Sequence, residues 1–308
     1  MFSHSIEAFG TFEKHILQNK KGDMIALVPA FGANLLDVQF SNISILDGYQ
    51  TPEELVENKW SKNIILFPFP NRLRDGKYQY GGKTYQFDIN NANTNNAIHG
   101  FSKNVEMQVT HVEAKKEFAS ITCTYTHAGT HKAYPFHFTF HVTFILRGGS
   151  LELEMTFTNT DKVALPVGLG WHPYFRISDK SDDTSLRMPN CQLIDIDERK
   201  LPTGNKIEFT GFEKITKIGN TSLDNGFYIT NRTKNAEVIL KSDKGTLSYW
   251  QETGAAKWNF LQVFTPPHRQ SIALEPMTCN IDAFNNQDGL VHLLPKASLQ
   301  GRFGISFK

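Results

Sequence analysis

A strict period of two across residues 136–144 constrains the fold of this chain more than any other feature. The apolar positions in this run are Phe136, Phe138, Phe140, Val142 and Phe144. Successive side chains of a strand point to opposite sides, so the alternation predicts a strand with one buried face. A second alternating run, residues 151–157, follows the pair Gly148-Gly149. Two such runs around a glycine turn predict an antiparallel hairpin.

The same pattern recurs along the chain, in residues 77–87 around Gly81-Gly82, in 118–126 and in 271–275. Only TPEELVEN reads as a helix, with Thr51 as N-cap, Pro52 at the first helical position and Glu54 completing a capping box. No internal repeat or linker divides the chain. We therefore expect one all-β domain over residues 1–308, a large antiparallel β-sandwich or barrel with one or two short helices.

Composition argues against several partners. The 32 Lys and Arg balance 31 Asp and Glu, which leaves a net charge of +1, and no five like charges are consecutive. Neither nucleic acid nor a membrane surface is an expected partner. The start of the chain lacks a leader-like apolar segment, and three scattered cysteines do not form a disulfide framework. We expect a soluble protein of the reducing cytoplasm.

Cofactor and metal signatures are missing from the sequence. Neither GxGxxG nor GxxxxGK[ST] occurs. His137 and His141 are four residues apart, but on a strand this spacing spans roughly 13 Å, too far for both rings to bind one ion. His127 and His131 fall in a predicted turn, where no third ligand is evident. We expect no metal and no cofactor.

Polar residues interrupt the strand pattern first in FPFPNRLRDGKY. Two prolines end a strand just before Asn71, Arg72 and Arg74, so these side chains are expected in a loop. A guanidinium there suits bidentate contact with hydroxyl or carboxylate oxygens. The alternative is a structural arginine that binds the loop backbone or pairs with Asp75.

Two histidines stand in similarly unusual places. His99 follows an Asn-rich segment and precedes Gly100, which allows backbone or ligand to approach closely. His172 lies within the aromatic segment Trp171–Phe175, where its imidazole would be oriented and partly desolvated. For each, a packed structural histidine is the alternative.

Two carboxylates complete the candidate set. Asp224 begins Asp-Asn-Gly, which is strong turn chemistry and by itself points to a structural role. Glu275 ends an alternating strand just before Pro276. It fits either a solvent-facing position or an acid at the floor of a pocket, and the local sequence leaves both readings open.

Taken together, NRLRDGKY, NAIHGF, GWHPYF, LDNGF and LEPMTCNIDAFN resemble, in this order, the aldose 1-epimerase (galactose mutarotase-like) family, over about residues 20–305. The resemblance implies the large antiparallel β-sandwich of that family. It also implies Glu275 as base, His172 as acid and His99 as a helper at the sugar ring. Arg72 and Asp224, with Asn71, would hold the sugar hydroxyls.

The activity so implied is interconversion of the α and β anomers of an aldohexose. One proton leaves the C1 hydroxyl and another reaches the ring oxygen, so one base and one acid suffice. Ordinary pKa values of about 4.3 and 6.5 allow a carboxylate and a partly protonated imidazole to coexist near neutrality. Trp171, Tyr174 or Phe175 could cover the apolar side of the sugar, although core packing suits most of them.

Three alternatives stay open at this point. A hexose-6-phosphate mutarotase would use Arg74 or Lys103 to bind phosphate. A sugar-binding protein of the same fold would lack activity. A glycoside hydrolase would use Asp224 and Glu275 as paired carboxylates. The identity of the sugar and the choice between monomer and homodimer are likewise open.

Overall fold

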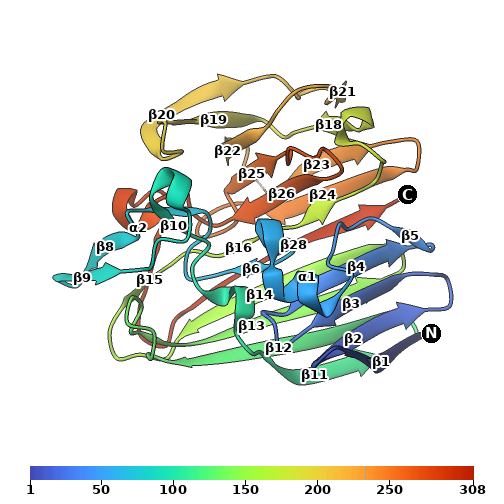
Figure 1. Cartoon of the computed structure of the whole chain (residues 1–308), viewed down its shortest axis with the longest axis horizontal. Coiled ribbons are helices and arrows are strands. Elements are labelled where there is room, and N and C mark those ends of the chain that lie inside the picture. The colour runs from blue at the N-terminus through green and yellow to red at the C-terminus, as the bar shows by residue number, and fades with distance from the viewer. Residues whose placement is uncertain (233) are drawn as a thin grey trace.

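Three large β-sheets form the body of the protein in a computed structural model that describes residues 1–232 and 234–308 (Figure 1). Within these residues the largest sheet has nine strands. Their order is β11 (Gln108–Ala114), β12 (Phe118–Ala128), β13 (His137–Arg147), β14 (Ser150–Asn159), β28 (Ser298–Phe307), β24 (Thr246–Glu252), β23 (Asn235–Lys241), β18 (Ser185–Arg187) and β21 (Thr216–Lys217).

The predicted hairpin lies at the centre of one half of this sheet. β13 and β14 pair antiparallel, with Arg147 opposite Ser150 across the Gly148-Gly149 turn. The alternating apolar side chains all point inward, and the ring of Phe138 stacks on that of Phe157 with centroids 4.2 Å apart. The period of two thus predicted both the strands and their buried face.

Two further sheets pack against the nine-stranded one. The first contains β1 (Phe2–Phe9), β2 (Phe12–Asn19), β3 (Met24–Val28), β4 (Asn34–Phe40) and β5 (Ile43–Ser44). The second runs β20 (Pro202–Phe209), β19 (Cys191–Ile196), β22 (Asp224–Ile229), β25 (Phe260–Phe264), β26 (Ile272–Met277), β16 (Gly170–Trp171) and β6 (Ile65–Leu66), and β17 (Tyr174–Phe175) also pairs with β26.

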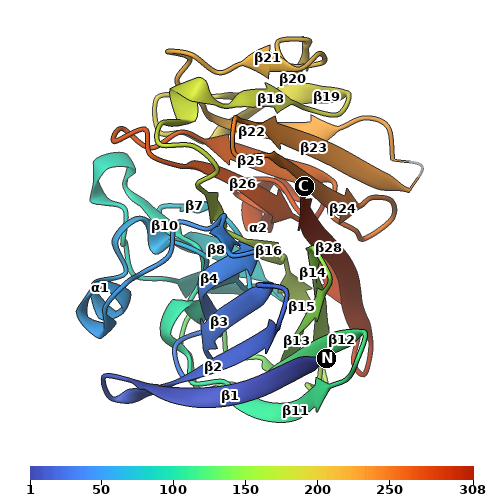
Figure 2. The ribbon, with the colours of Figure 1, turned by 90° about the vertical axis from the view of Figure 1, so that its right-hand side faces the viewer.

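The two views of the ribbon show that each of these two sheets lies beside a different part of the nine-stranded sheet. The N-terminal sheet lies beside β11–β14, and the sheet of β22, β25 and β26 lies beside β23 and β24 (Figures 1 and 2). Buried apolar residues from all three sheets form one continuous cluster. The architecture is the predicted antiparallel β-sandwich.

Short strand pairs and helices fill the connections. The two-stranded sheets are β7 (Arg72–Arg74) with β10 (Asn96–Ile98), β8 (Lys77–Tyr80) with β9 (Lys83–Gln86), and β15 (Leu165–Val167) with β27 (Val291–Leu293). The helices are α1 (Pro52–Glu57) and α2 (Ala283–Asn286), with the 3₁₀ turns η1 (Lys59–Ser61), η2 (Ala92–Thr94), η3 (Ser102–Asn104) and η4 (Ser181–Asp183).

The predicted helix and its cap are present. The N–H of Glu54 donates to Oγ1 of Thr51 at 3.3 Å. The Glu54 carboxylate, however, accepts from the N–H of Gln50 at 2.8 Å, one residue before the expected partner. Among the described residues, no helix combines the length and apolar character needed to cross a bilayer.

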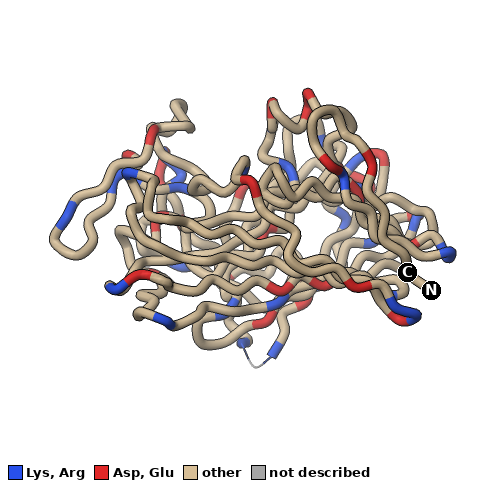
Figure 3. Tube along the Cα trace, turned by 90° about the horizontal axis from the view of Figure 1, so that it is seen from below, with Lys and Arg blue, Asp and Glu red and all other residues tan. Residues whose placement is uncertain are grey.

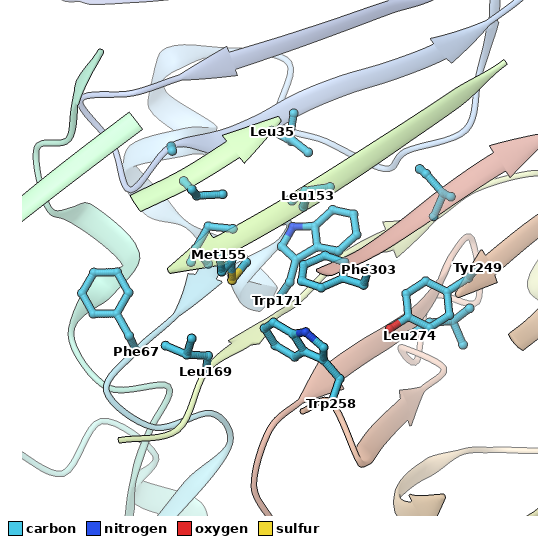
Figure 4. Packing of buried hydrophobic residues seen from close by; sticks show 14 of the residues in the cluster. Leu35, Phe67, Leu153, Met155, Leu169, Trp171, Tyr249, Trp258, Leu274 and Phe303 are labelled. Atoms are coloured by element: carbon cyan, nitrogen blue, oxygen red, sulfur yellow. The ribbon is translucent and has the colours of Figure 1, made fainter. Parts of the chain in front are cut away.

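Trp171 and Phe175 belong to the core of the sandwich. Trp171 is fully buried and stacks on Phe303 of β28, with centroids 5.3 Å apart (Figure 4). Phe175 meets Trp171 edge to face at 6.2 Å. Trp258 and Phe303 also meet edge to face, with centroids 4.8 Å apart. Neither Trp171 nor Phe175 is free to cover a sugar, so packing decides between the two roles considered for them.

Charges of both signs are interspersed along the visible trace of the chain (Figure 3). This arrangement agrees with the balanced composition. The three cysteines, Cys123, Cys191 and Cys279, are buried free thiols in different parts of the fold.

Candidate active site

The candidate site begins with the register of β26. Gly170 of β16 pairs with Met277, and Tyr174 of β17 pairs with Ala273. The same antiparallel register, continued across the interruption between β16 and β17, sets His172 opposite Glu275. Opposite residues of a ladder point to the same face of a sheet, so the two side chains must meet.

The register extends this arrangement into two rows across the sheet. Gln262 of β25 lies opposite Glu275, and Gly226 of β22 lies opposite Gln262. The neighbouring row, two residues along each strand, consists of Asp224, Phe264, Ala273 and Tyr174. Residues two apart on a strand share a face, so both rows present their side chains to one surface. Four separate stretches of the sequence are thereby brought together.

The facing wall of the site comes from β7 and β10. Arg72 pairs with Ile98, and the N–H of His99 donates to the carbonyl of Asn71 at 2.8 Å. A Cβ at Gly100, whose φ is +63°, would stand 2.2 Å from the carbonyl oxygen of Phe67. Only glycine permits this approach, so Gly100 fixes the place of the histidine before it.

These walls enclose a cavity of about 270 Å³. Every site residue predicted from the sequence lines it. The lining residues are Trp60, Ser61, Asn71, Arg72, Asn91, Ile98, His99, His172, Tyr174, Asp224, Gln262, Phe264 and Glu275.

His172 and Glu275 are in direct contact at the floor of the cavity. Nε2 of His172 lies 3.4 Å from Oε1 of Glu275. The His172 ring stacks on Tyr174 with centroids 5.0 Å apart and an interplanar angle of 7°. His99 meets the same ring edge to face at 5.0 Å. The imidazole of His172 is therefore held in one orientation between two neighbouring rings.

Asp224 is held from two sides. Its Oδ1 accepts a hydrogen bond from Nε2 of Gln262 at 3.0 Å, and Nζ of Lys200 lies 3.5 Å from its Oδ2. On the facing wall, Nη1 of Arg72 donates to Oδ1 of Asn71 at 3.0 Å. These contacts fix an anionic oxygen pair and a guanidinium on the walls around the catalytic candidates.

Several buried polar atoms of the cavity have no hydrogen-bond partner among the described residues. They are Nε of Arg72, Nδ1 of His99, Nδ1 of His172, Oε1 of Gln262 and Oε2 of Glu275. An unpaired buried polar atom costs about 1–3 kcal/mol, and native structures contain few of them. Their concentration around one cavity is typical of a site that binds a ligand rich in hydroxyl groups.

Burial favours the neutral forms of the central pair. Burial, reinforced by the charge of Asp224 and opposed by Arg72, raises the pKa of Glu275 well above its ordinary value. Burial lowers the pKa of His172 to about 3. Burial thus opposes the carboxylate and imidazolium expected from ordinary pKa values, even though the two groups lie 3.4 Å apart. Both shifts favour a single shared proton on Glu275 rather than on His172.

The environment of His99 is similar. Burial, together with the nearby His172, Arg72 and Lys103, lowers the pKa of His99 well below its ordinary value. A neutral imidazole can accept a hydrogen bond at one nitrogen and donate at the other. His99 thus suits a hydrogen-bonding role at a sugar hydroxyl or ring oxygen better than the role of a charged acid.

Local predictions around the site need three corrections. Asp-Asn-Gly does not form a turn: all three residues lie in β22, where Gly226 leaves room beside Gln262. Pro276 does not end the strand, since β26 continues to Met277. Arg72 and Arg74 lie in the short strand β7, not in a loop.

The charged neighbours considered in the sequence also have other partners. Asp75 binds Arg199, at 2.7 Å, and not Arg72. Arg74 lies 3.6 Å from Asp282, and neither Arg74 nor Lys103 lines the cavity.

Gln262 and Phe264 were missed by the sequence reasoning. The sequence did contain a signal, because Gln262 is the one polar residue of the apolar run FLQVF. In the structure its side chain is buried, with 3% exposed. A buried amide on a strand that faces the core needs a reason, and here the reason is Asp224.

The histidine pairs set aside as metal ligands have ordinary contacts. His141 is 2.8 Å from Oγ1 of Thr124, and His137 is exposed. His127 and His131 pack against the ring of Phe101, with centroids 5.2 and 4.6 Å away. The described residues contain no group of three or more metal-ligating side chains.

Comparison with known proteins identifies the class to which this fold and cavity belong. A profile of the aldose 1-epimerase family matches residues 14–306, and the chain therefore belongs to that family. The uncharacterized protein YihR of Escherichia coli (strain K12) is 29% identical over 273 residues, which cover 86% of this chain and 84% of that protein. A probable aldose 1-epimerase of Arthroderma benhamiae is 27% identical over 181 residues, 52% of this chain and 40% of its own length.

Solved structures agree on the fold. A galactose mutarotase-like protein from Clostridium acetobutylicum superimposes with a TM-score of 0.88 at 20% identity, covering 100% of this chain and 98% of its own. Galactose 1-epimerase from Lactobacillus acidophilus gives a TM-score of 0.84 at 18% identity, with coverage of 100% and 98%.

Proposed function

We propose that this protein is an aldose 1-epimerase that interconverts the α and β anomers of an aldohexose. The observation that carries the proposal is the buried contact between Nε2 of His172 and Oε1 of Glu275 at the floor of the cavity. Anomer exchange requires one group to remove a proton from the C1 hydroxyl while another delivers one to the ring oxygen. A buried pair that shares a single proton can supply both.

The pair would act as follows. In the free site the shared proton resides on Glu275, because burial disfavours both charges. Bound hydroxyls bring hydrogen bonds to the unpartnered Oε2 of Glu275, which stabilise its carboxylate. With the proton on His172, Glu275 takes the C1 proton, His172 protonates the ring oxygen, and the C1–O5 bond breaks. Rotation about C1–C2 and the reverse transfers close the other anomer.

Other lining residues would hold the sugar during this rotation. Arg72 and Asn71 form a donor-rich wall, and the Asp224–Gln262 pair forms an acceptor-rich wall. Neutral His99, packed against the ring of His172, would bind at the sugar ring. Groups on opposite walls can fix the hydroxyls that do not react, so that only C1 turns.

A 6-phosphate on the substrate is less well supported. The cations considered for it, Arg74 and Lys103, do not line the cavity, and Arg74 is paired with Asp282. A binding protein without activity would have no use for a buried acid whose pKa is raised, since a neutral amide would bind sugar without that cost.

A mutarotation assay of the wild-type protein tests the proposal. Freshly dissolved free aldohexoses and their 6-phosphates would be followed by polarimetry, with buffer alone as the baseline. We expect acceleration for at least one free aldohexose. Binding without acceleration would make the protein a sugar-binding member of the family, and acceleration of the phosphorylated sugars alone would reassign the substrate.

A further inference from the structure

At the rim of the cavity lies the indole of Trp60, which is not part of the hydrophobic core. Trp60 in η1 is 37% exposed, whereas Trp171 and Trp258 are fully buried. Its ring packs on Phe264, 6.1 Å away, and meets His268 edge to face at 6.0 Å. Trp60 and Phe264 both line the cavity, so an aromatic surface extends from the interior of the site to solvent.

The backbone of Trp60 is unusual. Its φ of 67° and ψ of 3° lie in the left-handed region, as do the φ angles of Asn58, Ser61 and Asn63. Asparagine adopts this region readily, but a bulky residue rarely does. An outlier of this kind justifies asking what the side chain does. Here the strained residue is the one whose ring borders the cavity.

Two buried tyrosines tether the strained segment. The hydroxyl of Tyr174 donates to the carbonyl of Trp60 at 3.1 Å, and the hydroxyl of Tyr49 donates to that of Lys59 at 2.8 Å. Tyr174 also stacks on His172. One side chain therefore connects the proposed acid with the backbone that presents the indole, which fixes Trp60 relative to the reacting groups.

The chemistry of the two sides differs. The unpartnered polar atoms come from the row of His172, Glu275 and Gln262 and from the β7–β10 wall. Trp60 and Phe264, which belongs to the other row, supply an apolar aromatic surface. A pyranose has hydroxyls around its rim and C–H bonds on its faces, and an aromatic ring buries such a face favourably. We propose that Trp60 is the stacking platform for the C–H face of the aldopyranose and that it determines affinity for the cyclic sugar. This inference rests on the proposed function.

The test compares W60L, W60F and W250F with the wild type in the mutarotation assay. Leucine keeps apolar bulk but has no aromatic face, and Trp250 of β24 is a partly exposed tryptophan that does not line the cavity. We expect W60L to raise KM about tenfold with kcat within about twofold. W60F should fall between W60L and the wild type, and W250F should match the wild type.

Fluorescence provides a second readout. Saturating sugar should change the tryptophan emission of the wild type and of W250F, and this change should be lost in W60F. If W60L does not fold, as judged by circular dichroism, the loss or persistence of the sugar-induced emission change in W60F tests the proposal instead. An active wild type with an unchanged KM in W60L, or an emission change that persists in W60F, overturns this inference alone. A wild type that neither binds nor converts any aldose overturns the proposed function as well.

Discussion

His172 and Glu275 face each other across an interrupted strand. β16 and β17 form one ladder with β26, and Pro173 stands in the gap between them. Proline has no N–H for the ladder, so the chain leaves regular pairing while keeping the register on both sides. Nε2 of His172 comes to 3.4 Å from Oε1 of Glu275, and the imidazole lines the cavity.

On the acid side of the pH profile, kcat/KM should fall only at a pH far below the pKa of an ordinary histidine. The active pair carries one proton and gains a second only near the pKa of His172, which burial lowers to about 3. We expect kcat/KM at pH 5 to be within about twofold of its value at pH 7. If Glu275 keeps its raised pKa, a histidine of pKa about 6.5 would load the pair with a second proton and leave only about 3% of the activity at pH 5. Rates measured from pH 4.5 to 9 distinguish the two outcomes.

Glu275→Gln should stabilise the fold at neutral and alkaline pH. Burial raises the folded-state pKa of Glu275 above its unfolded value, so the unfolded chain binds fewer protons between these two values. The free energy of unfolding therefore falls as pH rises through that window. An amide at position 275 does not titrate, so the variant does not lose this stability as pH rises.

We expect Tm of the variant to exceed that of the wild type at pH 8 and to approach it near pH 4.5. Glu117→Gln, at an exposed position, is the control. A Tm gap that does not depend on pH would argue against a buried, protonated Glu275.

Arg72→Lys should weaken sugar binding more than catalysis. Nε of Arg72 is unpartnered at the cavity, and a lysine cannot present a planar pair of donors there. Loss of a charge-assisted hydrogen bond predicts a KM increase of about 10- to 100-fold with a smaller effect on kcat. Arg74→Lys, two residues along the same strand but outside the cavity, should keep the wild-type KM. Equal effects of both substitutions would exclude a specific contact.

Trp171→Phe should affect stability and leave sugar affinity unchanged. The indole is fully buried, and its Nε1 donates to the carbonyl of Asn63 at 3.3 Å. The smaller ring leaves a void and an unpaired carbonyl, which should cost about 1–3 kcal/mol in urea unfolding. KM should stay within about twofold of wild type. A raised KM at unchanged stability would place Trp171 in the sugar site after all.

The sequence was most informative where period and turn chemistry agreed. The runs that became β13 and β14, and the β8–β9 hairpin with its positive φ angles at Gly81 and Gly82, needed no tertiary context. Asp-Asn-Gly misled because its turn preference is local. In β22 the pairing with β25 overrides that preference, and glycine serves to make room for Gln262.

The candidate residues could be named from the sequence, but their protonation could not. A pKa depends on burial from all directions, and the strands that surround Glu275 meet only in the fold. Gln262 was missed for the same reason, since its partner Asp224 lies on a different strand. Register across the sheet is information that no local window contains.

Exchange NMR of equilibrated glucose and galactose anomers, with wild type, Glu275→Gln and His172→Gln, addresses the proton-sharing pair itself. The wild type should accelerate exchange between the two C1 signals, and each variant should lose about 10²- to 10⁴-fold while its sugar binding stays detectable. A Glu275→Gln protein that exchanges the anomers as fast as the wild type would contradict the mechanism.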